Sequence, residues 1–121
     1  MNIKTITQNN IDVAVVTADS ILITNVQSAL DLIMTVKYET RAERIAIDKA
    51  CMTDDFFILS TGLAGEVLQK FINYHVKVAF FGDFTKYTSK PLHDFIYESN
   101  NGHDVFFVGT ETVAIDKLAN V

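Results

Sequence analysis

The chain has 121 residues, 49% of them hydrophobic and 21% charged, with a formal net charge of −5 at pH 7. A chain of this length normally folds as one domain with its own core, so we expect a single domain over residues 1–121. The basic residues form no run, which argues against nucleic-acid binding because phosphates require clustered Lys and Arg. One cysteine, no signal-peptide pattern and no apolar run near ~20 residues predict a cytoplasmic protein that does not associate with membranes.

The first elements are predicted to be two antiparallel strands and a helix. Residues 3–7 and 11–16 are β-branched runs joined by a segment with two asparagines, which tolerate the positive φ angles of a hairpin turn. Apolar residues then recur at spacings of three and four over about residues 25–37, as on the buried face of a helix. Thr24 and Gln27 have the spacing of a capping box at the start of that helix.

The rest of the chain is predicted to alternate strands with helices. Three short runs are the expected strands: residues 44–48, 77–82 and 104–108. The last two are almost continuously apolar, which is typical of strands covered on both faces. Three helices are expected to begin at about Leu63, Ser89 and Gly109. The apolar face of the first of these helices is predicted to include His75. The order β-β-α-β-α-β-α-β-α predicts an α/β fold with a mostly parallel sheet of about five strands and an antiparallel first edge strand.

Residues 56–68 read FFILSTGLAGEVL between the third strand and the second helix. They resemble the signature of STAS domains, in which a strand leads through an Asp-Ser-Ser/Thr-Gly-Leu-Gly turn into a helix. The element order is that of the STAS domain over essentially the whole chain, and residues 78–83 are similar to a strand of SpoIIAA-like proteins. Residues 23–39 and 54–73 look more narrowly like a small family of bacterial single-domain proteins with no assigned activity.

The resemblance implies a regulatory partner-switch domain that is not an enzyme. In regulatory STAS proteins a partner kinase phosphorylates the hydroxyl residue before the motif glycine, and phosphorylation releases the partner. That residue is Thr61 here, with Ser60 beside it, whereas Leu59 stands where the family has aspartate. A phosphate at the start of a helix is stabilised by free N–H groups. The residues alone also support a simpler hypothesis, in which Thr61 and Ser60 are N-caps of the second helix.

The predicted binding surface surrounds this motif and includes the loop over residues 82–89. The acidic pair Asp54-Asp55 follows the third strand, where open parallel sheets place ligands. The neighbouring aromatic pair is a candidate for an apolar pocket or an exposed partner surface. The candidate residues are Asp54, Asp55, Phe56, Phe57, Gly62 and Asp83.

No pattern predicts a cofactor or a metal site. The glycines form no phosphate-binding motif, so we expect Gly65 to serve close helix packing, and the histidines lack metal-ligand spacing. Cys51 has no evident partner that would activate it. We expect a regulatory protein or a second copy of the chain as the partner. Two alternatives stay open: a small-molecule or lipid-binding domain with an apolar cleft, as related SpoIIAA-like folds suggest, and an enzyme that uses Asp54 and Asp55.

Overall fold

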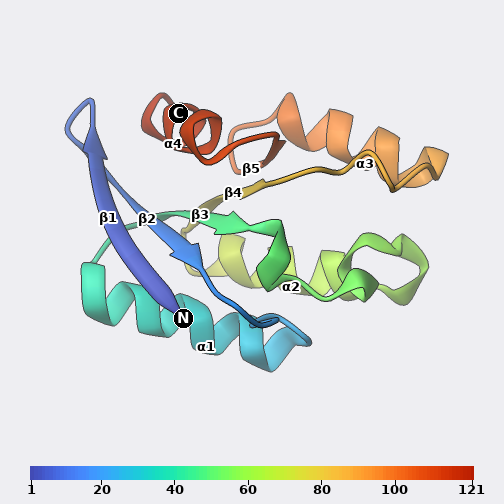
Figure 1. Ribbon diagram of the computed structural model, residues 1–121, viewed down its shortest axis with the longest axis horizontal. Helices are drawn as coiled ribbons and strands as arrows, with labels where there is room; N and C mark the ends of the chain where they lie inside the picture. Colours follow the sequence, from blue (N-terminus) through green and yellow to red (C-terminus); the bar gives the residue numbers. More distant parts are fainter.

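The computed structural model describes residues 1–121 as one five-stranded sheet with helices packed on both faces (Figure 1). The strands are β1 (Asn2–Gln8), β2 (Ile11–Thr17), β3 (Arg44–Asp48), β4 (Lys77–Phe81) and β5 (Val105–Val108). The helices are α1 (Val26–Thr40), α2 (Leu63–Asn73), α3 (Lys90–Asn100) and α4 (Glu111–Ala119). The order of these elements is the predicted one. None of the helices combines the length and the apolar character that crossing a bilayer requires.

Strands that are neighbours in the chain are also neighbours in the sheet, whose order is β1-β2-β3-β4-β5. β1 pairs antiparallel with β2 and every later pair is parallel, which confirms the predicted α/β sheet. The hairpin turn holds Asn9 and Asn10 at φ 55° and 63°, a backbone that asparagine accepts more readily than most residues. Because β2 to β5 run the same way, their carboxyl ends meet at one edge of the sheet. We call this the C-terminal edge.

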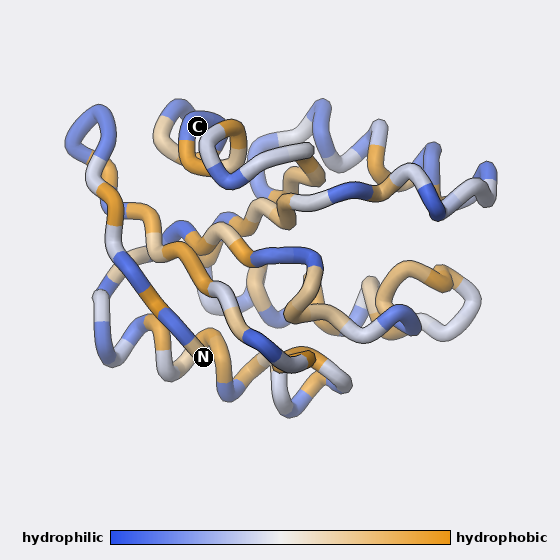
Figure 2. The backbone as a smooth tube through the Cα atoms, viewed as in Figure 1, coloured by the Kyte–Doolittle hydropathy of each residue, from blue (hydrophilic) through white to orange (hydrophobic).

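The sheet separates two hydrophobic cores. The larger core lies between one face and helices α1 and α2, and Leu92 of α3 also joins it. The smaller core lies under α4 on the other face; Figure 1 shows α1 and α2 on one side of the sheet and α4 on the other. Successive strand residues point to opposite faces, so Phe80 and Phe107 enter the larger core and Phe81 and Phe106 the smaller one. Burial on both faces explains the continuous apolar runs. Figure 2 shows hydrophobic colours along the central strands and a hydrophilic β1–β2 turn.

Two helix ends differ from those predicted. The capping box of α1 is formed by Asn25 and Ser28 rather than by Thr24 and Gln27. The Asn25 carboxamide accepts the Ser28 N–H at 2.8 Å, and the Ser28 hydroxyl accepts the Asn25 N–H at 3.1 Å. At the end of α2, His75 is exposed at φ 59° beyond the last helical turn, so its predicted place on the apolar face is wrong.

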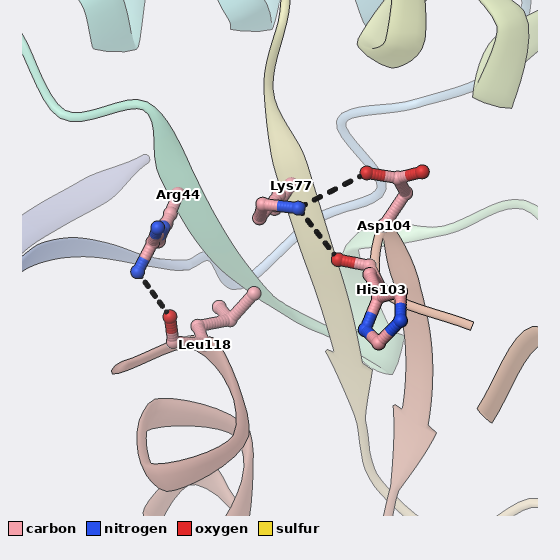
Figure 3. Close-up of polar contacts among 5 residues, drawn as sticks. All are labelled: Arg44, Lys77, His103, Asp104 and Leu118. Carbon is pink, nitrogen blue, oxygen red and sulfur yellow. Dashed lines mark hydrogen bonds and ion pairs between the residues drawn. The ribbon is translucent and has the colours of Figure 1, made fainter. Parts of the chain in front are cut away.

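At the amino ends of the parallel strands, polar contacts join neighbouring elements (Figure 3). Arg44 at the start of β3 donates to the Leu118 carbonyl in α4 at 2.8 Å. Lys77 at the start of β4 donates to the His103 carbonyl at 2.8 Å and pairs with the Asp104 carboxylate at 3.1 Å, just before β5. These contacts hold α4 and β5 to the sheet, so this edge has a structural role.

Candidate functional site

The segment between β3 and α2 lies at the C-terminal edge and folds as three short 3₁₀ turns. They are η1 (Lys49–Cys51), η2 (Asp54–Phe57) and η3 (Leu59–Thr61). Asp48 starts the first turn, because its carboxylate accepts the Ala50 N–H at 2.9 Å. Residues 53–62, which contain the predicted site, are called the motif loop below.

Thr61 is exposed, but its hydroxyl is engaged within the motif loop. The Oγ1 atom lies 3.0 Å from the Asp55 carbonyl oxygen and 2.9 Å from that of Ile58, toward which the hydroxyl donates. It also accepts the Leu63 N–H at 3.2 Å. The N-cap of α2 is Gly62, at φ 78°, where glycine avoids the steric cost of a side chain. The N-cap prediction for Thr61 and Ser60 is therefore wrong, and Thr61 instead ties the turns of the loop to the first turn of α2.

Phe56 and Phe57 are buried, with 1% and 3% of their surfaces exposed. The predicted exposed partner surface is therefore wrong for this pair, whereas the alternative of a pocket lining holds for Phe57. The Phe56 ring lies 5.0 Å from the Phe57 ring and 5.2 Å from that of Phe80, measured between centroids. Burying these rings anchors the motif loop to β4, because removing aromatic surface from water is favourable. The exposed apolar side chain of the loop is Ile58, at 48%.

Asp54 joins the motif loop to the loop between β4 and α3. Its carboxylate accepts the Tyr87 hydroxyl at 2.9 Å and the Lys86 ammonium at 3.2 Å. The Tyr87 ring stacks on Phe57 at 4.7 Å, and the ammonium groups of Lys49 and Lys86 lie 5.1 and 5.0 Å from its centre, within the reach of cation–π attraction. We call Asp54, Phe57, Lys86 and Tyr87 the clasp, because together they hold two loops that are distant in the sequence.

The clasp shifts the pKa values of its members without changing their charges at neutral pH. Hydrogen bonds from Tyr87 and then Lys86 favour the carboxylate and lower the pKa of Asp54. Burial, and then donation to Asp54, raises the pKa of Tyr87, while the bond to Asp54 raises the pKa of Lys86. A general acid or base at neutral pH needs a pKa near 7, and each shift here moves the group away from that value. The geometry therefore gives no support to Asp54 as a proton-transfer residue.

A notch of 430 Å³ separates the motif loop from the start of α3. Its lining residues are Phe57, Ile58, Leu59, Ser60, Lys86, Tyr87, Thr88, Ser89, Pro91 and Leu92. The structure thus brings the predicted loop over residues 82–89 against the motif loop. Gly62 and Thr61 are exposed beside Ser60. The candidate residues named from the sequence did not include Ile58, Lys86 and Tyr87. The one feature of the sequence that could have pointed to this site is the Lys-Tyr pair that follows an apolar strand.

Asp83 does not join the clasp. It follows β4, and its Oδ1 atom accepts the Thr85 N–H at 2.9 Å and the Thr85 hydroxyl at 2.7 Å. These two bonds lower the pKa of Asp83. Asp83 lines a second hollow at the ends of β4 and β5. The predicted binding residues therefore lie in two places along the C-terminal edge.

Two further observations limit the chemistry of this region. No three His, Cys, Asp or Glu side chains are grouped so that they could hold a metal ion. Cys51 is buried, and burial followed by the nearby Asp48 carboxylate raises the pKa of its thiol to about 11. A thiol with this pKa is protonated at neutral pH and is a poor nucleophile.

The fold and the site together define an α/β domain whose candidate binding surface lies at the C-terminal edge of its sheet. Residues 8–118 match the family described as "Domain of unknown function (DUF4180)", and the chain belongs to this family. The match runs from the end of β1 into α4, so it includes both the motif loop and the clasp. No curated protein and no solved structure matches the chain. Kinship with STAS domains stays a prediction.

Proposed function

We propose that the chain is a non-enzymatic binding module that recognises a regulatory protein partner through the notch and the motif loop. The observation that carries this proposal is the exposed Ile58 beside Ser60 and Thr61, on a loop that the clasp holds in place. Apolar side chains next to a preformed hollow make effective contact points, because little conformational freedom is lost when a partner binds.

Thr61 is the proposed control point of this surface. Its hydroxyl donates toward the carbonyls of Asp55 and Ile58, and phosphorylation replaces the proton that makes these bonds. The modification adds roughly two negative charges at neutral pH, next to a loop that already carries Asp54 and Asp55. The N–H groups at the start of α2 favour a phosphate in this position. Phosphorylation would therefore change the charge that a partner meets, and this charge, rather than the loss of the hydroxyl bonds, is the proposed cause of release.

The similarity of residues 56–68 to the STAS signature supports the same position. In regulatory STAS proteins the hydroxyl residue before the motif glycine receives a phosphoryl group from a partner kinase, and Thr61 precedes Gly62 here. The order of elements along the chain, with a helix starting at that glycine, supports the proposal. A kinase that also binds the unmodified surface is accordingly the partner we propose.

The test compares Thr61→Glu with Thr61→Gln. Both side chains lack the hydroxyl and have nearly the same size, so they differ in charge alone. Each variant and the wild type is immobilised and exposed to extract of the source organism, and bound proteins are quantified by mass spectrometry. We expect one protein to be retained by the wild type and by the Gln variant and to be lost, about tenfold or more, with the Glu variant.

Equal loss from both Thr61 variants would show that the hydroxyl bonds matter and the charge does not, which contradicts the switch. If both variants retain the partner equally, Thr61 is not part of the partner-binding surface. If the retained protein is this chain, the partner is a second copy. Phosphopeptide mapping of the chain isolated from its own cells should place the modification on Thr61, and Ser60→Ala should leave it unchanged.

A further inference from the structure

A larger hollow of 860 Å³ opens between α3 and the carboxyl ends of β4 and β5. Its volume falls within the roughly 300–1,000 Å³ of small-molecule sites. The carboxyl ends of parallel strands are also where open α/β sheets bind ligands. We call this hollow the groove; it shares no lining residue with the notch.

Aromatic side chains dominate the apolar part of the groove. Phe107 lies beneath it, and the Phe84 and Phe95 rings meet the Phe107 ring edge-on at 5.7 and 5.9 Å between centroids. Tyr97 and Ile96 of α3 form part of the wall, and Tyr97 is 71% exposed. The exposed Tyr97 ring beside a packed aromatic layer favours a flat, apolar ligand, because rings gain both burial and edge or face contacts.

The backbone at this end of β5 is not free to pair with an added strand. The Asn100 carboxamide accepts the Phe107 N–H at 2.7 Å and donates to the Phe107 carbonyl at 3.1 Å. Both outward polar groups of this residue are thus satisfied by α3. A partner that adds a strand here finds no open hydrogen-bonding groups on Phe107, so the groove favours a ligand held by side chains.

The charge of the groove selects among small ligands. Asp83 is its one acidic residue, and no Lys or Arg lines it. Both bonds from Thr85 reach the Oδ1 atom of Asp83, which leaves Oδ2 to accept from a ligand. The Nε2 atom of His93 lies 2.7 Å from the Tyr87 carbonyl, so it carries a proton there and donates. An anionic ligand would meet a carboxylate and no fixed cation.

We propose that the groove binds a compact aromatic amine, whose ring packs against Phe84, Tyr97 and Phe107 and whose ammonium group meets Asp83. Charge complementarity with Asp83 and the aromatic lining together define this ligand class. The site uses other residues than the partner surface, so either proposal can fail while the other holds.

Three probes with one ring system test this: tryptamine, which is a cation, indole, which is neutral, and indole-3-acetate, which is an anion. The chain contains no Trp, so indole fluorescence reports on the probe alone. Titration of the full-length chain into each probe gives the dissociation constants. We expect tryptamine to bind most tightly, indole about threefold to tenfold more weakly, and indole-3-acetate more weakly still. Chemical-shift mapping should locate tryptamine at residues 82–85, 93–100 and 107–109.

Two variants and one matched control identify the groups that bind. Asp83→Asn should weaken tryptamine about threefold to tenfold and leave indole nearly unchanged, since it removes charge alone. Tyr97→Ala should weaken both probes by a similar factor, because both lose a ring contact. Tyr38 is a tyrosine on α1, 89% exposed and outside the groove. Tyr38→Ala should leave every dissociation constant unchanged.

Several results overturn the proposal. These are no tryptamine binding up to about 5 mM, indole-3-acetate binding as tightly as tryptamine, or shifts confined to other regions. If the groove resonances move instead with protein concentration and no probe, this face is an interface between copies of the chain. Circular dichroism of each variant verifies that a loss of binding does not come from unfolding.

Discussion

Tyr87 joins the β4–α3 loop to the motif loop through several different contacts. Its ring stacks on Phe57 and faces two ammonium groups, while its hydroxyl donates to Asp54, 33 residues away in the sequence. A tyrosine suits this position because it combines a large apolar face with one polar atom at its tip. The sequence alone did not single it out, since nothing local distinguishes a tyrosine that reaches a distant carboxylate from one that faces solvent.

Removing the Tyr87 hydroxyl should change the pKa of Asp54. Tyr87→Phe keeps the ring stack and removes the largest of the interactions that lower the pKa of Asp54. We expect the pKa of Asp54 to rise toward the ordinary value of 3.8, as followed by carbon NMR of the carboxyl group during acid titration. Tyr97→Phe, which changes an exposed tyrosine outside the clasp, should leave that pKa where it was. An unchanged pKa in the Tyr87 variant would mean that the clasp does not form in solution.

The same lowered pKa predicts how stability depends on pH. A group whose pKa is lower in the folded state binds protons more readily when unfolded, so its contribution is present above the unfolded pKa and disappears as pH falls through the folded value. The difference in unfolding free energy between wild type and Asp54→Asn should therefore be constant near neutrality and shrink below about pH 4. Urea denaturation at pH 7 and pH 3 measures it. Ser60→Ala alters no titratable group, so its difference in unfolding free energy from wild type should be the same at both pH values. A pH-independent difference for Asp54→Asn would contradict the lowered pKa of Asp54.

At the level of elements, the strands and helices could be predicted from the sequence, because local residue patterns directly favour these structures. The two asparagines at the hairpin turn act through their own backbone, and Ser89 caps α3 through its hydroxyl, which accepts the Leu92 N–H; the structure has both as predicted. The capping box of α1 was placed one residue too early, because Thr24 and Asn25 are both good capping residues. The 3₁₀ turns of the motif loop were harder to predict, since buried Phe56 and tertiary contacts hold them rather than local propensity.

Replacing two of the glycines by alanine should change the stability of the protein in opposite directions. Gly82 follows β4 at φ 151°, and a Cβ there would lie 2.8 Å from the Cβ of Lys49, so Gly82→Ala should cost about 1–3 kcal/mol. Gly65 lies inside α2 with no neighbouring atom within 4 Å of an added Cβ; its predicted role in close packing is therefore wrong. Gly65→Ala should stabilise the protein by ~0.5–1 kcal/mol. Chemical denaturation checks both, and stabilisation by Gly82→Ala would contradict the described approach of η1 to β4.

At the scale of the molecule, one sheet carries two cores, and every central strand contributes side chains to both. The α/β class and the mostly parallel sheet were predictable because the order of elements restricts how strands can be connected. The candidate site was only partly predictable. The structure brings the two predicted loops, residues 53–62 and 82–89, against each other. The separation of Asp54 in the clasp from Asp83 in the groove depends on side-chain directions that only the folded chain determines.

Sharing the sheet should make the two cores unfold together. Phe71 is fully buried in the larger core and Leu118 in the smaller one. Phe71→Ala and Leu118→Ala should each lower the unfolding free energy, by about 3–5 and 2–5 kcal/mol respectively. We expect one transition in each case, with far-ultraviolet circular dichroism and tyrosine absorbance coinciding. Separate transitions in the Leu118 variant would mean that α4 and its core form an independent unit.

We propose that a protein partner docks on the motif loop and that Thr61 controls this docking. The most direct measurement places a photo-crosslinking amino acid at position 58 in living cells of the source organism, with position 38 on α1, which is the more exposed of the two, as a control. We predict one crosslinked partner from position 58, none shared with position 38, and its loss when Thr61→Glu is added but not when Thr61→Gln is added. The same crosslinked proteins from both positions, or a partner that is indifferent to the Glu substitution, would contradict the claim.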